Sequence, residues 1–113
     1  DKARRKEQWF KNYVFFNAPV ALLFYLNKRL STGSWMDMGG FLQTVMLTAR
    51  GFGIETCAQA ALAEYPDLVR SIVGISDDCH IVCGMALGYA DWSDPVNKYR
   101  TDRESVETFV HWK

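Results

Sequence analysis

The sequence lacks any imbalance of charge, because 13 lysines and arginines are matched by 13 aspartates and glutamates among its 113 residues. A neutral chain gives no electrostatic reason to expect binding to nucleic acid or to an anionic membrane surface. Cysteine is scarce, and three scattered residues argue against a disulfide framework and favour a reducing cytoplasm. The most apolar run, residues 15–26, is too short to cross a membrane.

Motifs in which bare side chains carry out chemistry are also missing. There is no G-x-S-x-G motif, and neither His80 nor His111 has an obvious serine partner for a hydrolase triad. The G-x-G fragment at residues 51–53 follows an expected helix, whereas a dinucleotide fingerprint follows a strand; no Walker motif occurs. Cys79 and Cys83 are four positions apart, and on an extended strand such positions lie about 13 Å from each other and cannot share one tetrahedral metal. We expect no metal site and no catalytic side chain, so a redox reaction would need a cofactor.

The stretch from Ser34 to Arg50 predicts one long helix. Ser34 or Asp37 can supply its N-cap, and glycines at 51 and 53 end it. Its apolar residues recur at helical spacing: Met38, Phe41, Leu42, Val45, Met46 and Ala49. Because its polar residues are few, we expect burial on more than one side, as a central helix or against a second subunit. The pair Gly39-Gly40 lets another backbone or a flat ligand come close.

Other segments have the signatures of strands, short helices and loops. Residues 15–26 suit a buried strand that begins or bends at Pro19, and residues 81–90 suit a second buried strand. The remaining expectations are a helical lead-in at 1–12, a short helix at 58–63, a helix at 66–73 capped by Gly74, an irregular stretch at 91–102, and an apolar tail at 103–113 that must pack on something.

The segment after Gly53 is interpreted as a turn with small side chains, at Thr56, Cys57, Ala58, Ala60 and Ala61. Two interpretations stay open: a tight packing corner, or a place where exposed backbone N–H groups meet a ligand. Cys57 is expected to be a small buried hydrophobe, with a reactive thiol near a helix N-terminus as the alternative. Cys83 is expected in the core. Arg100 and Arg103 suit either a phosphate clamp or solvated surface charges.

Four stretches together resemble the flavin-dependent nitroreductase family, and in particular its nitrobenzoate-type and nitroaromatic reductases: residues 15–26, 33–62, 84–91 and 95–107. The resemblance implies an α+β fold, with a mixed, mainly antiparallel sheet flanked by helices. It also implies an obligate homodimer with the long helix at its interface and FMN bound there. Electrons would pass from NAD(P)H to the flavin and then to a nitroaromatic, quinone or similar acceptor.

The resemblance covers nearly the whole chain, which we expect to be the C-terminal portion of one nitroreductase-like domain. The sequence begins DKARRKEQWF, with no initiator methionine and no signal-peptide pattern, as expected of a piece that starts inside a longer protein.

Family positions imply site residues. The backbone that faces the isoalloxazine ring, with an N–H reaching the ring's N5 edge, corresponds to Ala58, Gln59, Ala60 and Ala61. The family's arginine on the FMN phosphate matches Arg103, with Arg100 as a second. By analogy alone, the acceptor pocket is lined by Trp35, Met38 and Phe41.

Two alternatives remain beside this reading. The chain could be a non-catalytic module that self-associates through the Ser34–Arg50 helix and binds no flavin alone. A flavin-sequestering or deiodinase-like relative of the same fold is the other, because fold does not fix substrate.

Overall fold

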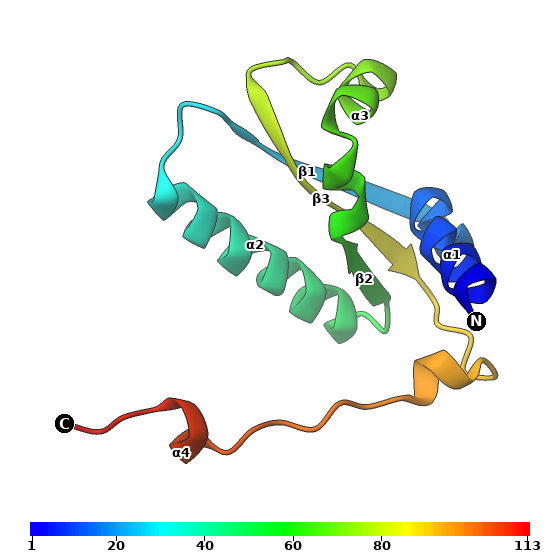
Figure 1. Ribbon diagram of the computed structural model, residues 1–113, viewed down its shortest axis with the longest axis vertical. Helices are drawn as coiled ribbons and strands as arrows, with labels where there is room; N and C mark the ends of the chain where they lie inside the picture. Colours follow the sequence, from blue (N-terminus) through cyan, green and yellow to red (C-terminus); the bar gives the residue numbers. More distant parts are fainter.

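A three-stranded sheet lies between helical layers in the computed structural model, which describes all 113 residues (Figure 1). The strands are β1 (Val20–Asn27), β2 (Glu55–Gln59) and β3 (Cys79–Gly88). Their order in the sheet is β1-β3-β2, and both pairs are antiparallel. The expected α+β fold, a mainly antiparallel sheet flanked by helices, is confirmed. None of the helices combines the length and apolarity that a membrane crossing requires.

The helical elements are α1 (Lys2–Phe10), η1 (Lys11–Asn17), α2 (Thr32–Gly51), η2 (Ala60–Glu64), α3 (Pro66–Val73), η3 (Pro95–Lys98) and α4 (Val106–Phe109). The bounds predicted for α3 are confirmed, with Gly74 as a left-handed C-cap at φ 74°. The helix predicted from Ser34 begins two residues earlier, and Ser31 occupies its N-cap position without a side-chain hydrogen bond. The prediction that Ser34 or Asp37 caps α2 was therefore wrong.

Two apolar clusters fix the layers on opposite faces of the sheet. On one face Phe24, Cys83 and Met85 are buried beneath α2. On the other face Leu62 and Ile81 pack with Val69 of α3, covered further by η1. The predicted core position of Cys83 is thus confirmed.

A β-bulge separates the two clusters along β3. The register skips Val82, because Phe24 pairs with Cys83 and Tyr25 with Ile81. Successive side chains on a regular strand alternate between faces, so Ile81 and Cys83 would share one face without the bulge. The extra residue turns Ile81 toward α3 while Cys83 remains under α2.

Two local predictions agree with the structure in part. The strand expected within residues 15–26, beginning or bending at Pro19, begins at Val20, directly after the proline. Residues 15–17 stay outside it, because Phe15, Phe16 and Asn17 all have positive φ, from 49° to 59°. This left-handed turn directs Phe15 into the cluster beneath α3. The short helix expected at 58–63 is the 3-10 helix η2, which begins two residues later, at Ala60. Pairing with β3 places the first two residues, Ala58 and Gln59, in strand β2 instead.

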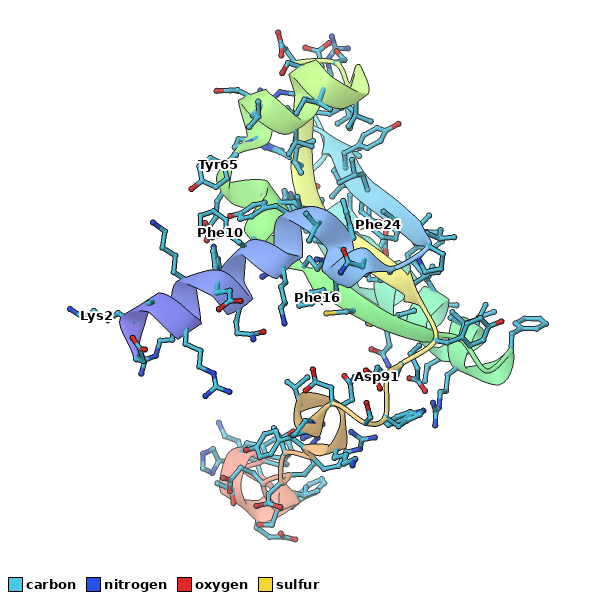
Figure 2. All side chains as sticks on the ribbon, turned by 90° about the vertical axis from the view of Figure 1, so that its right-hand side faces the viewer. Lys2, Phe10, Phe16, Phe24, Tyr65 and Asp91 are labelled. Carbon is cyan, nitrogen blue, oxygen red and sulfur yellow. The ribbon has the colours of Figure 1, made fainter.

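The chain exposes far more surface than a compact monomer. Its accessible area is 8987 Å², whereas a compact protein of 12.9 kDa exposes about 6,300 Å². The Cα radius of gyration is 16.6 Å, against about 13 Å for a compact chain of this length. The segment after β3 leads away from the sheet (Figures 1 and 2). The apolar tail expected to pack on something is exposed here, with Trp112 81% accessible.

Helix α2 is covered on one side only. Met38, Leu42, Val45 and Met46 pack against the sheet. The opposite side carries an exposed row at helical spacing, here called the outer stripe: Met36, Gly40, Gln43 and Leu47. Met36 and Leu47 are 74% and 63% accessible. Within a single chain the expected burial of α2 on more than one side is therefore not found.

Candidate functional site

The β2–η2 corner, defined as Ala58–Ala61, lies at an edge of the sheet. Strand β2 pairs only with β3, so its outer edge has no strand partner. Ala58 and Ala60 are exposed, whereas Gln59 and Ala61 are buried. The segment interpreted as a turn is thus a short edge strand that passes directly into a 3-10 turn. It presents backbone beneath small side chains, which is the surface a flat ring needs for close approach.

A buried side chain ties this corner to the N-terminal segment. Gln59 is 2% exposed, and its Nε2 donates a hydrogen bond of 2.8 Å to the backbone carbonyl oxygen of Asn12. Its Oε1 is buried without a hydrogen-bond partner. Sequence reasoning missed Asn12, because the two residues lie 47 positions apart and nothing local marks a backbone acceptor.

Cys57 precedes the corner on β2 and is exposed, so the expectation of a buried hydrophobe was wrong. It lies inside a strand and not at a helix N-terminus. Partial desolvation of its sulfur raises the pKa of the Cys57 thiol, and burial also raises the pKa of Cys83. Neither thiol has the depressed pKa of a reactive cysteine.

The two arginines lie in the segment that leaves the sheet. Nη1 of Arg100 donates to the carbonyl oxygens of Asn97 and Tyr99, and its guanidinium lies over the Trp92 ring at 5.8 Å. Nη1 of Arg103 donates to Thr101 and to the carbonyl of Asp102. Neither arginine forms an ion pair, so both charges remain available to an anion. The extended segment does not fold back over the β2–η2 corner of its own chain (Figure 1).

The three residues expected at the acceptor pocket all lie on the N-terminal half of α2. Trp35 is partly exposed, with its ring 5.6 Å from that of His80. Phe41 is exposed and meets Phe24 edge to face at 6.1 Å. Met38 is half-buried against the core. Their role toward an acceptor stays a prediction.

Two hollows flank the α1–η1 segment, and none of the corner residues Ala58–Ala61 lies in their walls. One, of about 780 Å³, separates α1 from residues 94–96, and Asn12 lies in its wall. The other, of about 410 Å³, is a wholly apolar groove between the α1–η1 segment and α3. No three His, Cys, Asp or Glu side chains are grouped to hold a metal ion.

Comparison with known proteins assigns the chain to a family. The Nitroreductase family matches residues 1–89, which include all three strands and the β2–η2 corner. The chain belongs to the nitroreductase family. Arg100 and Arg103 lie beyond this match.

Individual nitroreductases match almost the whole chain. The 4-nitrobenzoate reductase of Pseudomonas putida is 44% identical over 112 residues, covering 99% of this chain and 49% of the relative. The chloronitrobenzene nitroreductase of Comamonas testosteroni is 38% identical, covering 98% of this chain and 50% of the relative. The crystal structure of the FMN and NADPH-dependent nitroreductase NfnB from Sphigopyxis sp. strain HMH superposes with a TM-score of 0.95 at 36% identity, over 100% of this chain and 51% of that one. The chain therefore spans about half the length of the nitroreductases it matches.

Proposed function

We propose that this chain is a portion of one nitroreductase domain and takes part in FMN-dependent transfer of electrons from NAD(P)H to a nitroaromatic, quinone or similar acceptor. The observation that carries the proposal is the β2–η2 corner, an edge of small side chains in a chain of this family. The likeness to the FMN and NADPH-dependent NfnB supports it.

The residues of the corner fit a flat ring. Ala58 and Ala60 add little bulk above the backbone, and Gln59 turns its side chain away from the exposed edge. FMN, when bound, would supply the redox chemistry. This chain would orient the ring with backbone amides of the corner, where a fixed N–H dipole stabilises developing negative charge. Arg103, with Arg100 beside it in sequence, would hold the phosphate through charge-assisted hydrogen bonds.

A homodimer follows as part of the proposal. The exposed area exceeds that of a compact chain by about 2,700 Å² per copy. An obligate interface buries about 2,000–5,000 Å² in total, or about 1,000–2,500 Å² per copy, so this excess is enough to form one. The outer stripe of α2 is the surface we assign to a second copy, because Met36 and Leu47 are exposed on it and Gly40 between them allows close approach. We place the acceptor beside Trp35, Phe41 and Met38, near the start of the same helix.

A cytoplasmic location is also proposed. It is supported by the three free cysteines, which suit a reducing compartment.

Flavin retention tests the function. The purified chain is mixed with FMN and desalted, and its absorption spectrum is recorded before and after addition of NADH or NADPH. We expect a retained flavin band of altered shape that bleaches with the nicotinamide and returns with a nitrobenzoate. A chain that is folded and dimeric yet retains no flavin would contradict the proposal for this chain.

The exposed surface favours a second candidate, a non-catalytic module that self-associates through α2. That candidate predicts stable oligomers, measured by light scattering after gel filtration, with no flavin bound at saturating FMN. Both candidates predict that the chain self-associates, but only the first predicts that it binds FMN.

A further inference from the structure

We infer that the Gln59 side chain is a positioning residue, which holds the β2–η2 corner against the α1–η1 segment and leaves the corner's backbone free for a ligand. The effect of Gln59 on flavin binding rests on the proposed function, whereas the contact between Gln59 and Asn12 does not depend on it. Gln59 is 2% exposed, and its Nε2 donates to the Asn12 carbonyl oxygen at 2.8 Å.

The orientation of this carboxamide is fixed by its partner. A flipped amide would set Oε1 against the carbonyl oxygen of Asn12, so Nε2 must be the atom that faces it. Oε1 is then left buried and unpaired, which is unfavourable. A methionine would fill similar space without an unpaired oxygen. What Gln59 provides that an apolar residue could not is therefore the hydrogen bond to the Asn12 carbonyl oxygen.

The same orientation keeps the side chain away from the amides that follow. Gln59 occupies the N-cap position of η2 and makes no side-chain cap hydrogen bond. A shorter polar residue at such a position bonds the first amides of the turn. With the carboxamide directed to Asn12, the N–H groups that such a cap would bond, those of Ala61 and Leu62, stay free of a side-chain partner.

Two substitutions separate the loss of the Gln59–Asn12 hydrogen bond from the effect of a side-chain cap on η2. Gln59→Met removes the bond to Asn12 and adds no cap, whereas Gln59→Asn is too short to reach Asn12 and can cap η2 instead. Gln8→Met is the matched control, because Gln8 is exposed on α1 and makes no hydrogen bond with its side chain.

Hydrogen exchange of the intact chain gives the first readout. In Gln59→Met we expect amide exchange in residues 11–17 and in 58–62 to rise together by about tenfold, with α2 and α3 unchanged. In Gln59→Asn only residues 11–17 should accelerate. Unchanged exchange in both segments, or an equal rise throughout the chain, would overturn the inference.

The FMN dissociation constant gives the second readout. We expect it to rise about tenfold in Gln59→Met and further in Gln59→Asn, and to stay constant in Gln8→Met. Equal affinity in all four proteins would overturn the link to the ligand. If the unaltered chain binds no FMN, the proposed function fails for this chain, and the exchange pattern alone decides whether Gln59 positions the corner.

Discussion

The side chain of Leu62 occupies the space that a side chain at position 84 would fill. A Cβ on Gly84 would overlap Leu62 Cδ1 and lie 3.1 Å from Cε1 of Phe15. Gly84 is also the residue of β3 that pairs with Gln59. The β2–η2 corner is thus fixed at Gln59, which bonds to Asn12, and directly after its last residue by Leu62, which packs onto Gly84.

Gly84→Ala should destabilise the chain by about 1–3 kcal/mol, because the added methyl forces Leu62 out of its position. Leu62→Ala alone should also destabilise, through the cavity that it leaves. The double variant should be more stable than the sum of the two losses predicts. Urea unfolding of the four proteins measures this coupling.

Gly51→Ala is the control, because nothing lies within 4 Å of a Cβ at that helical position. It should be neutral or slightly stabilising. Strictly additive losses in the Gly84 and Leu62 pair would contradict the packing relationship.

Glutamates on the outer stripe of α2 should weaken self-association. Met36→Glu and Leu47→Glu place charge where the proposed interface must exclude water, and we expect the dimer dissociation constant to rise at least about tenfold each. Sedimentation velocity over a concentration series gives the constant. Ile72→Glu is the matched control, because Ile72 is equally exposed but lies on α3. Ile72 also lines the apolar groove between the α1–η1 segment and α3. If only Ile72→Glu weakened the dimer, the interface would lie at that groove and not at the outer stripe.

The sequence could predict elements whose signals are local. Pro66 and Gly74 mark the two ends of α3, and the spacing of Met38, Leu42 and Val45 marks the inner side of α2. Both are confirmed because caps and periodicity act within one or two turns. Pro19 likewise marked the start of β1, but hydrophobicity does not reveal the three left-handed residues that precede it.

The candidate site could be predicted in part. The small residues of the corner pointed to close backbone approach, but the place of Ala58 in a strand depends on pairing with Met85 of β3, far along the chain. The bond from Gln59 to Asn12 and the fit of Leu62 on Gly84 are also long-range. Such contacts follow from the assembled sheet and leave no periodic signal in the chain.

Cys57 should be alkylated slowly at pH 7 despite its exposure. Desolvation raises the pKa of its thiol, so the reactive thiolate is rarer than in a free cysteine. The rate of reaction with iodoacetamide should rise with pH, with a midpoint above that of a solvated thiol. Because the pKa of Cys57 is higher in the folded than in the unfolded chain, the thiol also favours folding below its unfolded pKa. This contribution to stability is lost as the pH rises through the folded pKa. Mass spectrometry of the Cys57 peptide, with Cys57→Ser as the blank, follows the reaction. A midpoint at or below the solvated value would contradict this.

Arg103→Ala should weaken FMN retention. The guanidinium donates only to its own segment and forms no ion pair, so its charge is free to bind phosphate. A hydrogen bond to a charged group is worth about 1.5–3 kcal/mol, which corresponds to a rise of about 10–100-fold in the FMN dissociation constant. Fluorescence titration with FMN measures the constant, and riboflavin, which lacks the phosphate, should bind Arg103→Ala and the unaltered chain equally. Arg29→Ala removes another exposed arginine, from the loop after β1, and should change neither constant. If Arg103→Ala weakened FMN and riboflavin alike, the arginine would act on the fold of the C-terminal segment and not on the phosphate.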